Sequence, residues 1–235
     1  MTTLLIATRN AHKVGEIQAI LGAPFRCLTL NDFAGAPVVV EDAEDFAGNA
    51  VKKAVELARW LAAHHSTFNL QHPTLDFVLA DDSGLEVDAL NGAPGVHSAR
   101  FAALDRSADG PSASPTGNSP DAANNAKLLR LLQDAPGEKR TGRFRCVIAL
   151  VPVPEDPVAS ASAVGPADEF AARIFDGACE GRIQFTPSGG GGFGYDPLFV
   201  PDGFTQTFAE LGEDVKNRLS HRAKALEKVK AFLNR

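Results

Sequence analysis

The chain alternates apolar stretches of strand length with amphipathic stretches of helix length, and this alternation limits the folds open to it. Strand side chains repeat every two residues and helix side chains every 3.6, so the two patterns can be told apart. In chain order, the first half predicts a strand at 4–8, a helix at 11–21, a strand that ends in an acidic loop within 36–46, a helix at 48–65 and a strand at 74–84. Strands interleaved with helices predict an α/β fold.

The second half is richer in strands. Residues 85–90 alternate apolar and acidic side chains, and Asn91-Gly92 follows them as a turn. The remaining predicted elements are a helix at 123–135, two strands at 142–153 and 169–183 that pair with each other, and a last helix after Ser220. A paired run of strands in an otherwise alternating chain favours a mixed sheet over a strictly parallel one.

Two segments, 105–123 and 152–169, are rich in Pro, Ser, Gly and Ala and have few large apolar residues. Such segments bury too little surface to offset the entropy that they would lose on ordering. We expect both to be mobile surface insertions. The full length of 235 residues suits one sizeable domain, so we expect residues 1–235 to form a single domain that carries both insertions.

Charge and cysteine content exclude several classes of protein. The formal net charge is −6, so the chain has no overall basic field for nucleic acid or an anionic membrane, and any anion site must be local. Its 3 cysteines form no CxxC pair, which favours reduced thiols over a disulfide or a zinc site. No stretch approaches membrane-spanning length, and no basic, apolar leader opens the chain. We expect a cytoplasmic protein that binds neither nucleic acid nor membranes.

The first predicted helix begins with cations where a helix disfavours them. Asn10 is expected to cap it, because its side chain can accept an unbonded backbone N–H. Arg9 precedes the first turn and Lys13 lies within it, beside the partial positive charge of the helix N-terminus. Either these are ordinary surface cations or a bound phosphate compensates them. Neither a GxGxxG fingerprint nor a P-loop follows the first strand, so this stretch alone leaves both possibilities open.

Carboxylates end two of the predicted strands. Asp81 and Asp82 close one strand, where Ser83-Gly84 is expected to turn the chain, and Glu41-Asp42 close another. Strand ends are where α/β sheets usually bind ligands, and neighbouring extended residues point to opposite faces, so one Asp can face a site. Carboxylates from two strand ends, together with substrate phosphates, suit Mg²⁺. The alternatives are turn-forming aspartates and an acidic surface loop.

A glycine run, Gly189–Gly192, precedes Phe193 and Tyr195, the only tyrosine. Successive glycine amides can form a nest for an anion, and the two rings could stack on a planar ligand. The competing interpretation is a flexible loop whose aromatic rings pack inside the protein. These two interpretations are about equally supported by the residues.

The last predicted helix repeats the unusual charge of the first. Ser220 is expected to cap it, which places His221 and Arg222 in its first turn, with Lys216 just upstream. Both side chains can donate hydrogen bonds to a carbonyl or a phosphate. Two helices with basic first turns favour a bound anion more strongly than one.

Five stretches resemble the inosine triphosphate pyrophosphatase family, which removes non-standard purine nucleotides. They are "LLIATRNAHKVGEI", "FAGNAVKKA", "ADDSGLEVDALNGAPGVHSARF", "GGFGYDPLFV" and "SHRAKAL". The stretches follow the family order and cover most of the chain outside the two insertions. The resemblance implies an elongated mixed β-sheet flanked by helices, with two lobes and a central nucleotide cleft. It also implies a homodimer that uses Mg²⁺ to hydrolyse ITP, dITP and XTP to the monophosphate and pyrophosphate.

The resemblance also assigns roles to individual residues. Asp82 matches the metal ligand and proposed general base, and Glu41 its acidic metal partner, although the stretch "EDAEDF" departs from the family pattern and leaves open whether Glu41 or Asp42 faces the metal. Lys13 would be one half of an ion pair whose other half is the triphosphate. The implied nucleotide contacts are Thr8, Arg9, Asn10, Ala11, His12, Lys13, Lys53, Ser83, Phe193, Gly194, Tyr195, Asp196, Lys216, His221 and Arg222.

Purine preference is expected from a donor such as Arg222 or His221 that bonds the six-position oxygen of ITP and XTP, where ATP carries an amino group. Two other functions compete with this one. The first is a pyrophosphatase for modified pyrimidine or methylated nucleotides, and the second is a nucleotide-binding regulator without turnover. Pyrophosphate release across a panel of nucleotides separates the three.

Overall fold

The computed structural model describes residues 1–64, 74–105, 118–154 and 170–234. The chain divides into two compact units, each built from separate stretches of sequence. The first unit comprises Met1–Asp82, Val147–Asp176 and Ala225–Arg235. The second comprises Ser83–Cys146 and Gly177–Lys224. One six-stranded sheet has the strand order β2-β1-β3-β4-β5-β6.

The elements follow one another in an α/β alternation that becomes strand-rich, as predicted. The strands are β1 (Thr2–Ile6), β2 (Phe25–Thr29), β3 (Phe77–Val87), β4 (Thr141–Pro152), β5 (Arg173–Ile183) and β6 (Phe199–Pro201). The α-helices are α1 (Ala11–Leu21), α2 (Phe46–Ala63), α4 (Asp121–Leu131), α6 (Phe208–Leu211), α7 (Glu213–Leu219) and α8 (His221–Leu233). Short 3₁₀ helices are η1 (Leu30–Asp32), η2 (Asp88–Leu90), η3 (Gly95–Asp105) and η4 (Gly137–Lys139).

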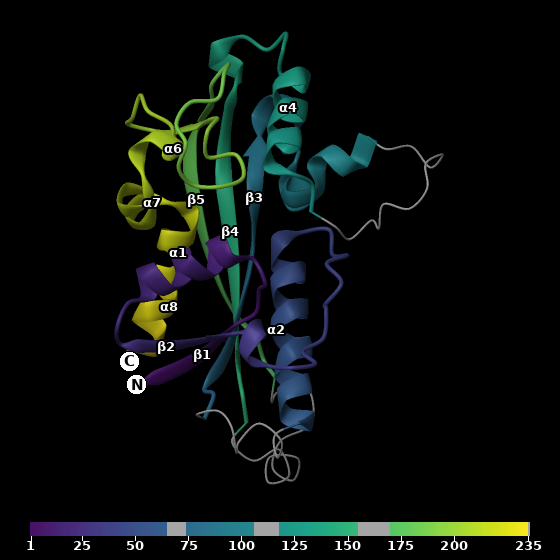
Figure 1. The fold of residues 1–235 in the computed structure, drawn as a ribbon, viewed down its shortest axis with the longest axis vertical. Helices are drawn as coiled ribbons and strands as arrows, with labels where there is room; N and C mark the ends of the chain where they lie inside the picture. The colour runs from purple at the N-terminus through teal and green to yellow at the C-terminus, as the bar shows by residue number, and fades with distance from the viewer. Residues whose placement is uncertain (65–73, 106–117, 155–169, 235) are drawn as a thin grey trace. The chain divides into compact units, whose positions relative to one another are not determined.

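In the first unit, β1 pairs in parallel with β2 on one side and with β3 on the other. Leu4 and Leu5 of β1 are completely buried, as expected of a parallel strand flanked by helices. Figure 1 shows helices of this unit on both sides of its strands. In the second unit, β5 and β6 pair antiparallel. The sheet is therefore mixed, and the predicted pairing of the strands at 142–153 and 169–183 is confirmed by the adjacency of β4 and β5.

The predicted strand at 36–46 is wrong. The segment is irregular up to α2, and the second strand is instead β2, which the sequence analysis missed. Valine stabilises a strand mainly where the strand can pair with a neighbour and bury one face. Here β1 already has β2 and β3 as its neighbours, and Val38 and Val40 are 79% and 51% exposed. Pro37 also lacks the N–H that a sheet ladder needs.

The turn predicted at Ser83-Gly84 is also wrong, because β3 runs through both residues without a break. Ser and Gly favour turns only weakly when the residues on both sides pack into a core. The apolar residues of β3 from Val78 to Val87 are buried on either side of this dipeptide, and burial keeps the strand extended. The chain turns later, at the predicted Asn91-Gly92, where both residues have positive φ.

The second unit has its own core. It combines Leu85 and Val87 of β3 with side chains from η3, α4, β4, β5, β6 and α6. Phe144 lies at the centre of an aromatic group, with ring centroids 4.7 Å from Phe199 and 6.1 Å from Phe208. Figure 1 shows α4 on one side of the strands of this unit and α6 and α7 on the other.

The two predicted insertions fall mostly outside the described residues, which exclude 106–117 and 155–169. The ends of the predicted insertions do lie in the described part of the chain. Residues 121–123, assigned to the first insertion, are helical and open α4. Pro152, assigned to the second, is the last residue of β4.

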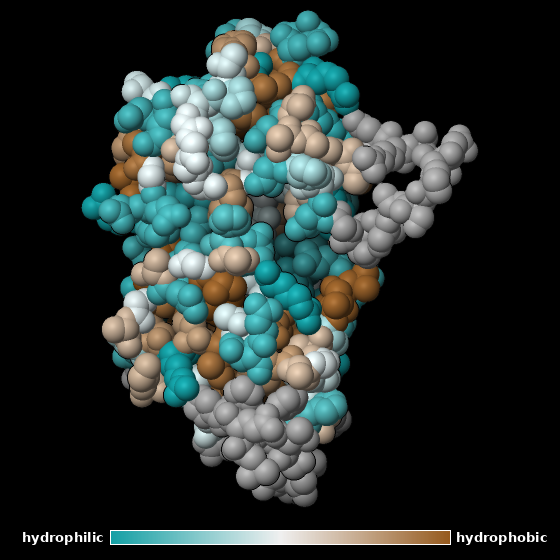
Figure 2. Space-filling view, viewed as in Figure 1, coloured by the Kyte–Doolittle hydropathy of each residue, from teal (hydrophilic) through white to brown (hydrophobic). Residues whose placement is uncertain are grey.

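On the face drawn in Figure 2, hydrophobic residues form small separate groups, and hydrophilic residues cover most of the remaining described surface. Among the described residues, the model contains no helix that is both long enough and apolar enough to cross a membrane.

Candidate active site

The start of α1 has the predicted cap. Asn10 Oδ1 accepts hydrogen bonds from the backbone N–H groups of His12 at 3.0 Å and Lys13 at 3.1 Å. The backbone N–H of Asn10 donates in turn to Thr8 Oγ1 at 3.2 Å. The cap therefore uses two of the amides that a phosphate could otherwise bind at this helix end.

The structure answers the question raised by the cations beside this cap. Lys13 Nζ lies 2.6 Å from Asp81 Oδ1, and the Asp81 side chain is completely buried. The prediction that Lys13 lacks a protein partner is wrong, because the carboxylate of β3 compensates its charge. Arg9 is exposed, and its guanidinium donates to the carbonyl of Ala36 at 3.0 Å. Within the protein, Arg9 thus ties the irregular segment before α2 to the start of α1.

Lys53 of α2 gathers the carboxylates that the sequence placed at separate strand ends. Its Nζ donates to the carbonyl of Asp81 at 2.8 Å and to Glu41 Oε1 at 3.1 Å, and lies 3.5 Å from Asp82 Oδ1. Lys53 is only 7% exposed, so its ammonium needs these oxygen partners. We call Glu41, Lys53, Asp81 and Asp82, together with Lys13, the acidic–lysine cluster.

Asp82 is the member of the acidic–lysine cluster with a buried oxygen that lacks a hydrogen-bond partner among the described residues. The residue is 6% exposed, and its Oδ2 atom has no hydrogen-bond partner in the described part of the chain. Burial raises the pKa of Asp82, while the positive charges of Lys53 and Lys13 act in the opposite direction. A buried carboxylate with one unused oxygen is suited to take a proton or a cation.

The geometry separates Glu41 from its neighbour Asp42. Glu41 faces Lys53 and the acidic–lysine cluster, whereas Asp42 Oδ1 pairs with Lys52 at 2.6 Å, and the Asp42 side chain is 66% exposed. The hydrogen bond from Lys52 lowers the pKa of Asp42. Glu41 is therefore the acidic side chain of this pair that shares a partner with Asp82.

No group of three or more His, Cys, Asp or Glu side chains within the described ranges is arranged to hold a metal ion. Mg²⁺ is commonly held by one or two carboxylates, with water and substrate phosphates completing its octahedron. Asp82 and Glu41 fit that pattern, and the buried Oδ2 of Asp82 is available as a ligand atom.

The glycine run is shaped by contacts within the protein. A Cβ on Gly189 would come within 2.5 Å of the Ala209 backbone, so only glycine fits at this approach. The amide of Gly191 donates to the carbonyl of Ala209, that of Phe193 to Asp196 Oδ2 and that of Gly194 to Asp121 Oδ2. Protein acceptors thus take three of the amides that an anion nest would offer.

The two aromatic rings after the glycine run differ in role. Tyr195 is 3% exposed and lies in the core of the second unit, where its hydroxyl donates to the carbonyl of Ser98 at 2.9 Å. Of the two interpretations left open for Tyr195, the structure favours packing inside the protein, because its ring lies in this core. Phe193 is only partly buried, and Lys216 Nζ lies 4.3 Å from its ring centroid. Lys216 also pairs with the buried Asp196 at 2.5 Å.

The start of α8 has the predicted cap too, since Ser220 Oγ accepts from the amide of Ala223 at 3.2 Å. His221 and Arg222 are nearly completely buried. The His221 ring stacks on Phe144 with centroids 4.9 Å apart, and Arg222 Nη2 donates to Ser83 Oγ at 2.8 Å. Two predicted contacts that lie 139 residues apart in the sequence, Ser83 and Arg222, are thus brought together.

Some residues that shape these clusters were missed by the sequence analysis. Asn49 Oδ1 accepts from the amide of Ala43 at 3.0 Å and so holds the loop that carries Glu41. Asp121 and Asn125 of α4 contact the glycine loop, but the sequence analysis placed Asp121 in the first insertion and treated Asn125 only as a helix residue. The roles of Asp121 and Asn125 give no signal in the local sequence, because Gly194 lies 73 and 69 residues further along the chain.

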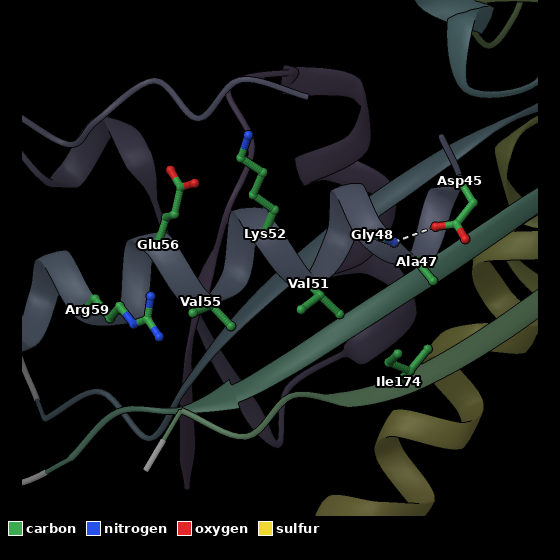
Figure 3. Close-up of a pocket in the computed structure, with 9 residues that line it drawn as sticks. All are labelled: Asp45, Ala47, Gly48, Val51, Lys52, Val55, Glu56, Arg59 and Ile174. Carbon is green, nitrogen blue, oxygen red and sulfur yellow. Dashed lines mark hydrogen bonds between the residues drawn. The ribbon is translucent and has the colours of Figure 1, made fainter. Parts of the chain in front are cut away.

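A groove of about 480 Å³ lies along α2 in the first unit (Figure 3). Val51, Val55 and Arg59 of α2 point toward Ile174 of β5, while Lys52 and Glu56 point away from it. The groove is lined by Lys52 and not by Lys53, Glu41 or Asp82. It is therefore separate from the acidic–lysine cluster.

Known proteins resemble this chain over nearly its whole length. The model of the Ham1 family matches residues 4–232. The dITP/XTP pyrophosphatase of Desulforamulus reducens is 42% identical over 233 residues, which is 99% of this chain and 96% of that protein. The dITP/XTP pyrophosphatase of Geobacter sulfurreducens is also 42% identical, over 99% of this chain and 97% of that protein.

Solved structures agree with the sequence relatives. A HAM1 protein from Coxiella burnetii is 32% identical with a TM-score of 0.74, covering 100% of this chain and 99% of that one. A nucleoside-triphosphatase / dITP/XTP pyrophosphatase from Mycobacterium abscessus is 35% identical with a TM-score of 0.63, covering 97% of this chain and 98% of that one. These comparisons confirm the resemblance that the five sequence stretches suggested. The chain belongs to the Ham1 family.

Proposed function

We propose that this protein is a nucleoside-triphosphate pyrophosphatase that hydrolyses ITP, dITP and XTP to the nucleoside monophosphate and pyrophosphate, cleansing the nucleotide pool. The observation that carries the proposal is the acidic–lysine cluster, in which Asp82 keeps one buried oxygen without a partner beside Lys53 and Glu41. Relatives that match nearly the whole chain are named dITP/XTP pyrophosphatases, which supports this choice of substrate.

The metal in this proposal is Mg²⁺, held by Asp82 and Glu41. Both are oxygen ligands, as Mg²⁺ prefers, and Lys53 already holds the two carboxylates near one ammonium. When bound, Mg²⁺ would neutralise charge on the phosphate oxygens and so favour attack at phosphorus. The unused Oδ2 of Asp82 supports its role as a ligand.

Asp82 also acts as the general base. Its raised pKa makes the carboxylate a better proton acceptor than an exposed aspartate, so it can take the proton of the water that attacks the α-phosphorus. The P–O bond to the β-phosphate breaks, and pyrophosphate leaves with the negative charge. Lys13, Lys53 and the start of α1, from Thr8 to Lys13, bind the triphosphate and stabilise that charge.

Lys13 has a double role in this proposal. Its ion pair with Asp81 keeps the ammonium in place before substrate arrives. A triphosphate adds negative charge beside this pair, and an ammonium has three N–H donors and can therefore bond more than one acceptor. Lys13 is thus held in position to donate before the substrate binds. The negative charge of Asp81 offsets the unfavourable interaction between this cation and the positive end of the helix.

The proposed nucleoside contacts are residues around Phe193 and Arg222. Phe193 offers an aromatic face to the purine, while Lys216 and Asp196 fix that ring. Arg222 and His221 are buried donors that can bond the six-position oxygen of the purine. Arg222 also donates a hydrogen bond to the hydroxyl of Ser83. ATP presents an amino group at that position, which would leave a buried donor unpaired and so disfavour ATP. Gly194 and Tyr195 contribute through the shape of the loop.

The test is a nucleotide panel with Mg²⁺ in which the product is identified as pyrophosphate or phosphate. We expect ITP and XTP to release pyrophosphate at a kcat/KM roughly 10²-fold or more above that of ATP. Equal rates for ITP and ATP, or release of phosphate, would exclude the proposed function. Best turnover with methylated or pyrimidine nucleotides would indicate a different substrate class, and ITP binding without turnover would indicate a regulator.

We further propose a cytoplasmic homodimer in which residues 1–235 act as one domain. The cysteines within the described ranges are free thiols, and burial raises the pKa of Cys27 and of Cys179 to about 11, which suits a reducing compartment. The family resemblance supports the dimer. Sedimentation equilibrium should give twice the 24.8 kDa of one chain, and a monomer mass at micromolar concentration would exclude the dimer.

A further inference from the structure

The backbone of Gly194 is held on both sides by one helix, which contacts the peptide group before this residue and the one after it. Its N–H donates to Asp121 Oδ2 at 2.6 Å, and its carbonyl accepts from Asn125 Nδ2 at 3.0 Å. Asp121 and Asn125 are four residues apart on α4 and therefore lie on the same face of the helix. We call this pair of contacts the α4 clamp.

The α4 clamp acts at the residue where the loop changes direction. Gly194 has φ of +63°, a left-handed conformation that other residues rarely adopt. On one side of Gly194, Tyr195 enters the core; on the other, Phe193 stays partly exposed beside Lys216. The orientation of the two peptide groups that flank Gly194 therefore determines where the backbone places the Phe193 ring.

Asn125 makes this contact although the arrangement leaves its own acceptor unsatisfied. The residue is 8% exposed, and Asn125 Oδ1 is buried without a hydrogen-bond partner among the described residues. The amide orientation is set by its bond to the Gly194 carbonyl, because only the NH₂ group can donate to it. A buried acceptor without a partner destabilises a protein, and such departures are expected at functional sites.

We propose that Asp121 and Asn125 are positioning residues for purine recognition. They act through the two peptide groups that flank Gly194, whose orientation places the Phe193 ring against the purine. They do not touch the substrate themselves. This inference rests on the proposed function, in which Phe193 contacts the purine.

The experiment compares the ratio of kcat/KM for ITP to kcat/KM for ATP in the wild type and four variants. Asn125→Ala and Asp121→Ala each remove one side of the α4 clamp. Asp121→Asn is the conservative variant, because its amide oxygen can still accept from Gly194. Arg140→Lys is the matched control, since Arg140 binds the carbonyls of Leu132, Ile183 and Gln184 at the other end of α4.

We expect the two alanine variants to lower the ITP-to-ATP ratio at least about tenfold, mainly by raising KM for ITP. Asp121→Asn should keep most of the ratio, and Arg140→Lys should lower the melting temperature but keep the ratio. Using both alanine variants keeps the test valid if one of them does not fold.

The inference is overturned if the alanine variants lower turnover of ITP and ATP equally, or if they change only the melting temperature. It is also overturned if Arg140→Lys lowers the ratio as much as they do. A wild type that does not prefer ITP would instead exclude the proposed function itself. The two failures are therefore distinguishable by the wild-type measurement.

Discussion

At the scale of single residues, burial distinguishes the carboxylates of the acidic–lysine cluster from those at the surface. Asp42 and Glu41 are neighbours, yet the exposed Asp42 has a lowered pKa and a surface partner, whereas Glu41 joins the acidic–lysine cluster. Asp81 is fully buried and paired with Lys13, while Asp82 is buried with one oxygen unused. The same side chain in consecutive positions thus has two roles, because extended residues face opposite ways.

The first prediction concerns Asp82→Asn, which should abolish turnover and raise stability at neutral pH. The folded protein holds the Asp82 proton more tightly than the unfolded chain, because burial raises its pKa. The resulting penalty is absent below the ordinary aspartate pKa of about 3.9 and grows as pH rises through the raised pKa. Without added metal, the melting temperature of the variant should therefore be higher than that of the wild type at pH 7. The two melting temperatures should become equal in acid. A less stable variant at pH 7 would contradict this account.

The second prediction uses Glu41 and Asp42 as a matched pair. Glu41→Gln should raise the Mg²⁺ concentration for half-maximal activity by about tenfold or more, because it removes a charged ligand from the acidic–lysine cluster. Asp42→Asn should leave that concentration nearly unchanged, since Asp42 contacts Lys52 at the surface. Magnesium titrations of pyrophosphate release from ITP measure both. The reverse order of effects would reassign the ligand to Asp42.

The third prediction concerns Tyr195→Phe, which removes only the hydroxyl that donates to Ser98. Its loss leaves a carbonyl without this partner in the core, so urea denaturation should show a loss of about 1 kcal/mol. The ITP-to-ATP ratio should stay at the wild-type value, because the ring is buried and does not contact the purine. A selective loss of activity toward ITP would show that Tyr195 takes part in recognition.

At the scale of elements, helices could be predicted more reliably than strands. The helices α1 and α2 and both predicted caps, Asn10 and Ser220, follow from signals within one or two turns of the chain. The strand expected at 36–46 failed because pairing depends on partners elsewhere in the chain. The turn expected at Ser83-Gly84 failed for a similar reason, since burial of β3 overrides a local turn signal.

The fourth prediction concerns the end of α4, where a buried cation joins two elements. Arg140 is 2% exposed, and its guanidinium donates to the carbonyls of Leu132, Ile183 and Gln184. Arg140→Lys keeps the charge but cannot reach all three acceptors with the same planar geometry. We expect a loss of about 2–3 kcal/mol in urea denaturation with kcat for ITP unchanged. A fall in kcat at a temperature where the variant is fully folded would contradict a purely structural role.

At the scale of the whole molecule, motif residues could be predicted from the sequence but their partners could not. Lys13, Lys53, Ser83 and Arg222 were all identified from their stretches. Their contacts join residues that are distant in the chain, such as Ser83 and Arg222, or Lys13 and Asp81. A charge pattern in the sequence indicates that a charged side chain needs a partner, but only the folded structure shows which residue that partner is. The α4 clamp could not be predicted from the sequence for the same reason, because Gly194 is distant in the chain from Asp121 and Asn125.

Both units share the chain in an unusual way. The passages from one unit to the other fall at 82/83, 146/147, 176/177 and 224/225, inside β3, β4, β5 and α8. The first unit begins at Met1 but needs residues 225–235 to be complete. Domains commonly fold as units while the ribosome is still extending the chain. For this protein, a ribosome that has reached residue 220 has finished the sequence of neither unit, so neither can reach its final form before that point.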